Sequence, residues 1–407
     1  MQTLHINLVS DQLLPNLIPA FADKSCCGIV LVLGDSTLRH KADTLTQLYQ
    51  GRGLPIVNIS EGSSSHRPVL LQQQARELID WLATHHGDKR WMLNATCGTK
   101  PMALVFANAF NRFNKDHPAT ENNGIPQALI CYTDSQNHEL PLLNDGVDFA
   151  MQWQSVMTLD EMLAANGFER SKCINKDNDQ DVLARAELTR YLGRQFQRDC
   201  RYFIGQLQYA ANEAANQPEL RSELKEKPNQ DAQKLCLVLQ EKGLLQCSST
   251  QNKSLQFSDK DTCHYLAGRW LEELTYINAL DCGFDEVAMS VEGEWQTQAF
   301  KQNNERGKNN EFDVLICHNN QLLTIECKAK YWGDHQQGES TNQDVVLKLE
   351  SLGRKLGGLF GERLLISARP LPDEMVQRAR DNRIALCDRA DGRTIRAELQ
   401  RYFDKMN

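Results

Sequence analysis

The first 150 residues alternate short apolar runs with segments of helical periodicity. Apolar runs without regular polar positions are typical of strands buried on both faces, as in a parallel sheet covered by helices. The pattern therefore predicts a doubly wound α/β domain whose ligand site lies beyond the carboxyl ends of its strands. The expected strands occupy residues 4–9, 28–36, 54–59 and 90–95, and the expected helices residues 41–49, 70–84 and 102–113.

A turn of small residues, 96–100 (Thr-Cys-Gly-Thr-Lys), follows the fourth apolar run and leads into a helix that begins with Pro101. Small residues let backbone amides approach a phosphate, and the N-terminus of the next helix carries partial positive charge. With two threonine hydroxyls and the Lys100 cation, the turn predicts an anion site. The alternative is a plain strand-to-helix turn with Thr99 as its cap. The spacing of glycine and lysine excludes a Walker loop.

The middle of the chain predicts several helices followed by a small hairpin. This order resembles a winged-helix connector, whose wing often touches DNA, but a rigid spacer or a dimerisation element fits the same pattern. Residues 172–180 are polar and predict a linker. The expected helices occupy residues 159–168, 182–197, 202–216 and 231–242, and the hairpin strands residues 243–247 and 254–257.

Near the C-terminus, two apolar runs flank an Asn-rich turn, which is typical of a β-hairpin. The runs are residues 310–316 and 322–328, and both carry charges among valines, leucines and isoleucines. Glu326 and Lys328 are two residues apart, so both project from one face of their strand. Asp313 lies on the other strand. Because unpaired charges are costly to bury, these groups need a metal ion, a phosphate or one another.

Periodicity on either side of the hairpin predicts a compact α/β unit with these charges at its centre. Residues 264–276 form an expected helix that carries Glu272, and residues 345–358 form a second helix that ends in glycine. The apolar residues 363–367 predict a further strand. Helix, hairpin, helix and strand therefore follow one another around the acidic residues.

This set of charges suits phosphodiester hydrolysis. Asp313 and Glu326 supply the oxygen ligands that hard cations such as Mg²⁺ prefer, and such a cation generates hydroxide near neutral pH. Lys328 would orient the attacking water or stabilise developing negative charge. Cys327 is expected to point to the opposite face and pack there. The alternative is an edge hairpin whose acids pair with Lys328 on a solvated surface.

Length, charge and cysteine content narrow the remaining possibilities. A chain of 407 residues with 41% hydrophobic content is long enough for two or three domains. No apolar stretch approaches the length of a membrane span and no signal peptide is evident, so we expect a cytoplasmic protein without membrane attachment. The thirteen cysteines and ten histidines show no zinc spacing, and most cysteines are expected to be buried thiols. The net charge of −8 confines nucleic-acid contacts to local basic patches.

Glu272 on a helix, Asp313 on one strand and Glu326-x-Lys328 on the next resemble the core of the restriction-endonuclease-like PD-(D/E)xK superfamily. Phe312 stands where the motif has proline, which is a frequent departure in that superfamily. The resemblance implies a metal-dependent endonuclease with Asp313, Glu326, Lys328 and Glu272 as its catalytic residues. The implied ligands of Mn²⁺ or Mg²⁺ are Asp313, Glu326 and Glu311.

The amino-terminal part resembles the CRISPR-associated Rossmann-fold (CARF) sensor domains, which bind cyclic oligoadenylates made during type III CRISPR immunity. The resemblance rests on residues 10–12 (Ser-Asp-Gln) and 15–16 (Pro-Asn) after the first strand, and on the 96–100 turn. In that family the turn is commonly Thr-Gly-Gly-Thr-Lys, so Cys97 departs from it. The implied ligand-binding residues are Ser10, Asp11, Gln12, Asn16, Asp35, Thr96, Cys97, Gly98, Thr99 and Lys100.

The order of these parts resembles the CRISPR ancillary nucleases over nearly the whole chain. We expect an α/β multidomain protein with a Rossmann-like CARF sensor at residues 1–150, a winged-helix-like connector at 151–258 and a PD-(D/E)xK nuclease domain at 259–407. The resemblance implies a homodimer that binds cyclic tetra-adenylate across the sensor interface and then cleaves DNA, single-stranded RNA or both. Two alternatives remain: a ligand-sensing, DNA-binding regulator with an inactive core, and a sensor that degrades its own ring ligand.

Overall fold

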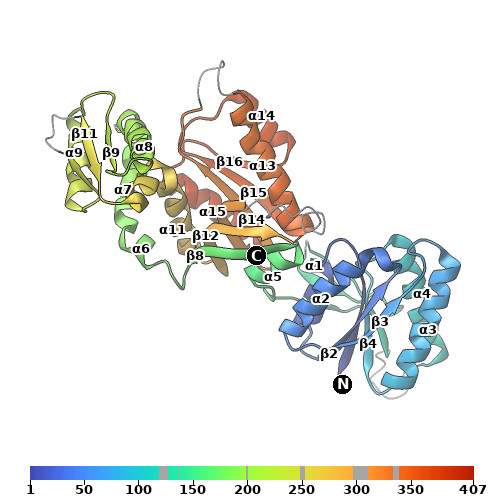
Figure 1. Ribbon diagram of the computed structural model, residues 1–407. Helices are drawn as coiled ribbons and strands as arrows, with labels where there is room; N and C mark the ends of the chain where they lie inside the picture. The colour runs from blue at the N-terminus through green and yellow to red at the C-terminus, as the bar shows by residue number, and fades with distance from the viewer. Residues whose placement is uncertain (119–126, 136, 199, 248–252, 297–309, 333–338) are drawn as a thin grey trace. The chain divides into compact units, whose positions relative to one another are not determined.

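The computed structural model describes residues 1–118, 127–135, 137–198, 200–247, 253–296, 310–332 and 339–407 (Figure 1). The chain divides into two compact units, Met1–Glu169 and Arg170–Asn407. Among the described residues, no helix is both long enough and apolar enough to cross a membrane. All thirteen cysteines lie in described segments and are free thiols, most of them buried, as expected.

The first unit is built on a five-stranded sheet in the order β3-β2-β1-β4-β5, and every pair of neighbouring strands is parallel. The predicted doubly wound α/β architecture is therefore confirmed. The short strand β5 was not predicted from the sequence. The strands are β1 (Thr3–Leu8), β2 (Cys26–Leu33), β3 (Ile56–Glu61), β4 (Arg90–Asn94) and β5 (Ala128–Cys131), and the main helices are α1 (Leu14–Ala22), α2 (Arg39–Gly51), α3 (Pro68–His86) and α4 (Lys100–Asp116).

The two faces of this sheet differ in chemistry, because successive side chains of a strand point to opposite faces. Leu4 and Ile6 of β1 pack with apolar residues of α3 and α4. Asn7 points to the other face, where α1 and α2 lie (Figure 1). Its amide donates to the Tyr49 hydroxyl (2.8 Å), which donates to the Asn16 carbonyl (2.8 Å). These hydrogen bonds hold the start of α1 against the carboxyl end of β1.

The remainder of the first unit is a two-stranded ribbon and a short helix. The ribbon pairs β6 (Glu139–Pro141) with β7 (Ala150–Gln152). Helix α5 (Leu159–Ala165) begins with a capping box in which Thr158 and Glu161 satisfy each other's backbone amides. Glu161 also forms a two-point ion pair with Arg52, at 2.5 and 2.7 Å, and this pair ties α5 to the end of α2.

The second unit contains a six-stranded sheet in the order β16-β15-β14-β13-β12-β8. Strand β8 corrects one expectation, because its last residues fall in the segment predicted as a linker. An edge strand that is largely half-exposed needs few apolar residues, so its sequence lacks the usual alternation. The strands are β8 (Phe168–Asn175), β12 (Glu286–Trp295), β13 (Asn310–His318), β14 (Gln321–Lys328), β15 (Gly361–Ser367) and β16 (Ala385–Cys387).

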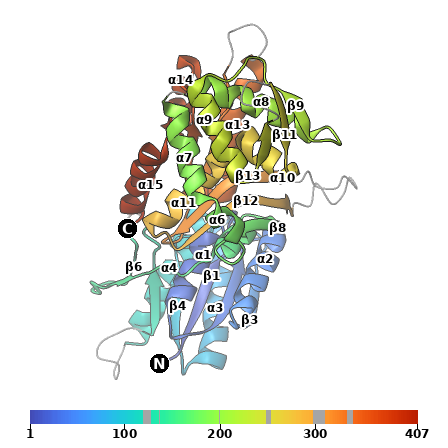
Figure 2. The same ribbon diagram turned by 90° about the vertical axis from the view of Figure 1, so that its left-hand side faces the viewer.

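Helices cover both faces of this sheet (Figures 1 and 2). One face packs against α11 and α15, and α7 packs on these two helices in the large core of the unit. The other face packs against α13 and α14. The predicted strand after the second helix is confirmed as β15. The bounds are α6 (Gln180–Ala184), α7 (Ala186–Gln197), α10 (Lys260–His264), α11 (Trp270–Cys282), α13 (Glu339–Gly357), α14 (Asp373–Asp381) and α15 (Gly392–Met406).

Two expected helices are each divided in the structure. The segment 182–197 breaks at Arg185, between α6 and α7. The segment 264–276 divides into the end of α10, a π-helical turn at Tyr265–Arg269, and α11. Gly268 departs from helical backbone angles within that turn (φ 163°, ψ −23°). Glycine is a weak helix former, which explains why the break occurs there.

The helices and the small hairpin predicted for the middle of the chain are present, and their likeness to a winged-helix connector stays a prediction. The hairpin strands belong to a small antiparallel sheet in the order β10-β11-β9. The strand β9 was not predicted; it follows α8 and precedes α9 in the chain. The apolar residues of these elements belong to the same core as those of α7 and α11. The elements are α8 (Arg201–Ala215), β9 (Arg221–Glu223), α9 (Gln230–Glu241), β10 (Leu245–Cys247) and β11 (Ser254–Phe257).

Candidate functional sites

The acidic hairpin is formed by β13 and β14, which pair in the antiparallel sense. Asn319 and Asn320 form its two-residue turn with φ of 45° and 62°. Positive φ at both positions is the pattern of a type I′ turn, which asparagine tolerates and which matches the twist of a hairpin. The register places Val314 opposite Ile325. Asp313 therefore lies opposite Glu326. Both side chains point to the face of the hairpin opposite that of Val314 and Ile325.

Asp313, Glu326 and Lys328 converge as the sequence predicts. Lys328 Nζ lies 3.2 Å from Asp313 Oδ2 and 2.6 Å from Glu326 Oε1. Both acids are buried, with 8% and 7% of their surface exposed. The Cys327 amide donates to Asp313 Oδ2 at 2.7 Å, and its thiol points to the other face, 3.4 Å from Thr275 Oγ1. The expected alternation along β14 is confirmed, and the three charged groups form one buried cluster.

The electrostatics of this cluster follow from two carboxylates and one ammonium group in a poorly solvated place. Burial, and then the charge of Glu326, raise the pKa of Asp313 to about 6. Burial by itself would lower the pKa of Lys328, but the two carboxylates outweigh it and raise that pKa. One positive charge faces two acids, so the cluster carries excess negative charge that a cation would neutralise.

Glu272 lies beside this cluster, in the first turn of α11. Burial, and then the charge of Asp313, raise the pKa of Glu272 well above its usual value. Glu272, Glu311 and Lys328 all line a cavity of about 360 Å³. The structure therefore brings together all five residues that the sequence assigns to the catalytic and metal sites.

The donor set suits a hard divalent cation. Within the described segments, no three His, Cys, Asp or Glu side chains are already gathered as a metal site. Lys328 Nζ instead contacts both Asp313 and Glu326. The two buried carboxylates of Asp313 and Glu326 provide the oxygen ligands and the negative charge that Mg²⁺ or Mn²⁺ requires. Asp313 and Glu326 are the residues that could hold such an ion.

Three basic residues that line the same cavity, Lys172, His264 and Arg269, were not predicted. Arg269 forms ion pairs with Asp261 and, at 3.6 Å, with Glu273. It stands three residues before Glu272, so helical spacing alone would have suggested that the two share one side of the chain.

In the first unit, the predicted ligand residues gather at one edge of the sheet. β1, β2 and β4 are neighbours and parallel, so the loops after their carboxyl ends lie together. Ser10 Oγ donates to the Gln12 carbonyl at 3.0 Å, and both Asp11 and Gln12 are exposed. Burial lowers the pKa of Lys41, and the Asp11 carboxylate opposes that shift. Lys41 is thus a second cation near this edge, one that the sequence did not identify.

In the 96–100 turn, Gly98 adopts a φ of +77°, and a Cβ there would lie 2.8 Å from Leu8 Cβ. Cys97 is buried, and burial raises the pKa of its thiol to about 12. Thr99 caps α4 by accepting from the Met102 amide (3.4 Å), and it donates to the Ser65 carbonyl (2.5 Å). The capping alternative is thus confirmed for Thr99.

Lys100 is exposed, and within the described part of the chain its ammonium makes no hydrogen bond or ion pair. Thr96 Oγ1 accepts from the Thr133 amide at 2.7 Å. Asp35 accepts hydrogen bonds from Thr37 and Ser65, which lower its pKa. Asn16 is fully buried, and its side-chain amide donates to the Leu8 carbonyl at 3.0 Å. In this structure its side chain therefore stabilises the loop after β1.

Ser65 was missed by the sequence analysis, yet it contacts both Thr99 and Asp35. It belongs to the loop after β3, whose carboxyl end lies at the same edge of the sheet. The general rule for parallel sheets would have pointed to this loop.

Comparisons with solved structures identify the fold. The chain is similar over 100% of its length to 99% of protein VC1899 from Vibrio cholerae, with a TM-score of 0.81 and 21% identity. It is similar over 99% of its length to 97% of Can2 from Sulfobacillus thermosulfidooxidans, solved in complex with cyclic tetra-adenylate, with a TM-score of 0.72 and 20% identity. These likenesses, at such identities, show a shared fold.

A third solved structure is described as a type III CRISPR defence DNA nuclease activated by cyclic oligoadenylate. The likeness covers 91% of this chain and 47% of that one, with a TM-score of 0.54 and 16% identity. Comparison with curated protein sequences finds no match.

Two family models match separate segments of the chain. Residues 4–125 match the Card1 CARF domain, and residues 259–406 match the Card1-like endonuclease domain. The first segment contains the strands β1 to β4 of the parallel sheet, apart from Thr3, and the 96–100 turn; the second contains Glu272, Asp313, Glu326 and Lys328. The chain therefore carries a CARF domain of the Card1 type and a Card1-like endonuclease domain in one polypeptide.

Proposed function

We propose that this protein is a metal-dependent nuclease of type III CRISPR antiviral defence and that cyclic oligoadenylate activates it. Cyclic tetra-adenylate is the expected ring. The observation that carries the proposal is the buried cluster of Asp313, Glu326 and Lys328 within a segment that matches an endonuclease domain. The likeness to Can2, which was solved with cyclic tetra-adenylate, supports the activator. DNA, single-stranded RNA or both are the proposed substrates.

Each member of the cluster would have a distinct task. A bound Mn²⁺ or Mg²⁺ would neutralise phosphoryl oxygens and supply hydroxide near neutral pH. Asp313 and Glu326 would hold that ion. Lys328 would supply a fixed positive charge where negative charge develops on the phosphoryl group. Glu272, whose pKa is raised by burial and by Asp313, would hold or release a proton beside the reacting phosphate.

Activation would begin at the edge of the sheet that gathers Lys100 and the loops after β1, β2 and β4. A cyclic oligoadenylate is a ring of phosphodiesters, and a ring of four can have two-fold symmetry. Two copies of this chain related by a two-fold axis would present the same residues to both halves of the ring. We therefore propose a homodimer as the activated form. Ring and substrate must then tighten each other's binding by the same factor.

Plasmid nicking tests this function. The full-length protein would be incubated with supercoiled DNA, and separately with labelled single-stranded DNA and RNA, in Mn²⁺ or Mg²⁺. Rings of three, four and six adenylates would each be added or omitted. We expect cutting that requires both a divalent ion and a ring, with the ring of four most effective. Cutting that is equal with and without every ring would contradict activation.

The second candidate is a ligand-sensing regulator that binds DNA without cutting it. The observation that favours it is the position of Lys328 Nζ between the two carboxylates, together with the winged-helix-like element. A mobility-shift assay without metal distinguishes the two functions. DNA binding that responds to the ring, in a protein that cuts neither DNA nor RNA in Mn²⁺, would support the regulator.

Lys100→Ala is expected to weaken activator binding about 10- to 100-fold, because a hydrogen bond to a charged group contributes roughly 1.5–3 kcal/mol. Calorimetry with cyclic tetra-adenylate measures the change. Lys24→Ala is the matched control, since Lys24 is exposed and lies two residues before the amino end of β2, at the opposite edge of the sheet. An unchanged dissociation constant for Lys100→Ala would remove Lys100 from the site.

The metal requirement is expected to depend on pH through Asp313, whose pKa is raised to about 6. Above this pH the carboxylate is free to bind a cation, whereas below it a proton competes for the same oxygens. The Mn²⁺ concentration that gives half-maximal cutting should therefore rise about tenfold for each pH unit below 6, and change little above pH 7. A requirement that stays constant from pH 5 to 8 would contradict a metal-binding role for Asp313.

A further inference from the structure

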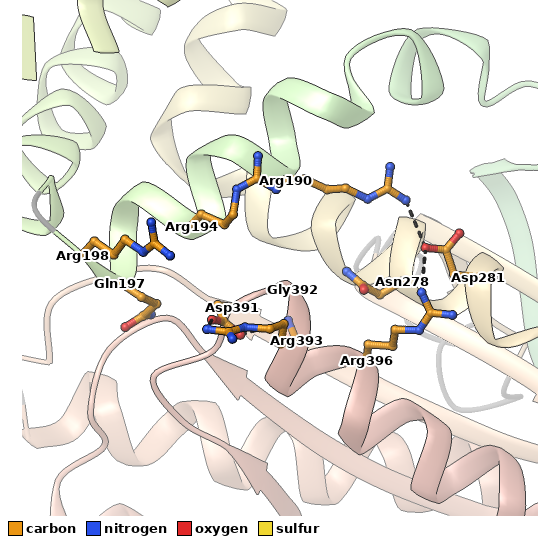
Figure 3. Close-up of a pocket in the computed structure, with 10 residues that line it drawn as sticks. All are labelled: Arg190, Arg194, Gln197, Arg198, Asn278, Asp281, Asp391, Gly392, Arg393 and Arg396. Carbon is orange, nitrogen blue, oxygen red and sulfur yellow. Dashed lines mark hydrogen bonds and ion pairs between the residues drawn. The ribbon is translucent and has the colours of Figure 1, made fainter. Parts of the chain in front are cut away.

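A second cavity of the endonuclease-containing unit, of about 480 Å³, is lined mainly by arginines (Figure 3). Arg190, Arg194 and Arg198 come from α7 and its end, and Arg393 and Arg396 come from the start of α15. Among the described residues that line it, Asp281 and Asp391 are the acids. Five guanidinium groups thus face two carboxylates, in a protein whose net charge is −8.

Both of these aspartates already accept hydrogen bonds or form ion pairs within the protein. Asp281 Oδ2 lies 3.0 Å from Arg190 and 3.6 Å from Arg396, as the dashed lines of Figure 3 mark. Asp391 caps α15 by accepting from the amides of Arg393 and Thr394, each at 2.9 Å. The side chains of Arg194 and Arg198 are exposed and form no ion pair in the part of the chain that is described. The cavity therefore keeps unneutralised positive charge.

Helix stability does not account for this arrangement. Arginines at the end of α7 would interact favourably with the negative end of its dipole. Arg393 and Arg396, however, lie in the first two turns of α15, where the helix carries partial positive charge and cations are unfavourable. Their presence there is explained if the cavity binds an anion.

The cavity is separate from the acidic cluster. Glu272 and Asp281 both belong to α11 and are nine residues apart. Nine residues make two and a half turns, so the two side chains leave α11 on opposite sides and roughly 13 Å apart along its axis. Asn278, on the same side as Asp281, lies 3.8 Å from where a Cβ on Gly392 would stand. That side of α11 faces α15 and is remote from Glu272.

The walls of the cavity are held in place. The Gln197 amide donates to the carbonyls of Ala368 (2.6 Å) and Ala390 (3.0 Å), which joins the end of α7 to the loops after β15 and β16. Its side-chain oxygen accepts from Arg201 at 2.9 Å. Arg190, Arg194 and Arg198 repeat every four residues, which extends the row of charge over roughly 12 Å along α7. A row of that length fits a chain of linked phosphates better than one isolated phosphate.

We propose that this cavity, formed by α7, α11 and α15, binds the phosphodiester backbone of the nucleic-acid substrate outside the cutting site. Arginine is suited to this task because its planar guanidinium contacts phosphate oxygens in pairs. Such contacts position a strand without reading its sequence. The inference deepens the proposed nuclease function and rests on it for the identity of the strand.

The test compares Arg194→Gln/Arg198→Gln with the wild type. Binding of a fluorescein-labelled single-stranded DNA to the full-length protein is measured by anisotropy with cyclic tetra-adenylate, without divalent metal, at several salt concentrations. Losing two phosphate contacts should weaken binding about 20-fold at 0.1 M salt and reduce the slope of log affinity against log salt by about 1.4. Arg380→Gln/Arg383→Gln, the same charge change at and just beyond the end of α14, should leave both quantities unchanged.

Three outcomes would overturn the inference: wild-type binding by Arg194→Gln/Arg198→Gln, equal weakening by both double variants, or displacement of the DNA by polyglutamate as readily as by unlabelled DNA. Nicking by the wild type, measured in parallel, separates this result from the proposed function. If the wild type nicks DNA and the variant binds DNA as the wild type does, the proposed role of the cavity alone would be refuted. Loss of binding in the variant without any nicking by the wild type would refute the nuclease function alone.

Discussion

Asp313→Asn is expected to lower nuclease activity about 1000-fold or more while leaving binding of cyclic tetra-adenylate unchanged. The amide cannot supply the negative charge that holds a divalent cation, and loss of electrostatic stabilisation at a reacting centre alone costs about 100- to 1000-fold. Asn keeps an oxygen that can accept from the Cys327 amide, so the hairpin should fold as before. Rates of plasmid nicking under saturating ring and Mn²⁺ measure the loss.

Thermal unfolding of Asp313→Asn without metal shows whether a folding defect causes its loss of nuclease activity. Because the pKa of Asp313 is raised in the folded protein, the stability that it contributes is complete below its unfolded pKa and is lost as pH rises through about 6. Asp313→Asn should therefore not be the less stable protein at pH 8. Asp388→Asn, which changes an exposed acid of the same unit, should cut at the wild-type rate. Wild-type cutting by Asp313→Asn would refute the assigned site.

Arg185→Ala is expected to lower the free energy of unfolding by about 3–5 kcal/mol, because it leaves a buried carboxylate without its main partner. Glu273 is fully buried and accepts two hydrogen bonds from Arg185, at 2.8 and 2.5 Å. Arg269 would remain, at 3.6 Å. The guanidinium of Arg185 also lies 4.8 Å from the centre of the Tyr265 ring, and that contact would be lost too.

Urea unfolding followed by fluorescence measures this change. Adding Glu273→Gln to Arg185→Ala should restore part of the loss, since the second change removes the unpaired charge. Arg401→Ala is the matched control, because Arg401 pairs with Glu398 on the surface of α15, where an ion pair contributes about 1 kcal/mol or less. Equal losses of unfolding free energy from Arg185→Ala and Arg401→Ala would show that the buried ion pair stabilises the protein no more than the surface pair does.

The sequence predicts the parts of the fold whose pattern is local. The apolar strands of the first sheet and the Asn-rich hairpin both appear where expected, because continuous apolar runs and a two-residue turn leave few alternatives. β8 was missed because an edge strand can be polar. The breaks at Arg185 and Gly268 were missed because helical periodicity continues across them, and an isolated glycine is often tolerated within a helical pattern.

The residues of the candidate sites also divide into those that a local sequence pattern predicts and those that only the folded chain brings together. Asp313, Glu326 and Lys328 could be predicted together since they belong to one hairpin, and strand alternation places them on one face. Ser65 and Arg269 lie outside that hairpin. The rule for parallel sheets and helical spacing point to their regions of the chain, but not to the contacts that they make. The arginine cavity could not be predicted, because α7, α11 and α15 are far apart in sequence and meet only in the folded core.

Gly98 has a consequence for finding distant relatives. Its positive φ and its contact with Leu8 leave no room for a side chain, whereas Cys97 beside it has an ordinary backbone and a buried side chain. Of the two central positions of the turn, only the second is therefore restricted to glycine by its geometry. A search pattern that accepts any small residue at the first position and demands glycine at the second would recover sensors that a strict double-glycine motif overlooks.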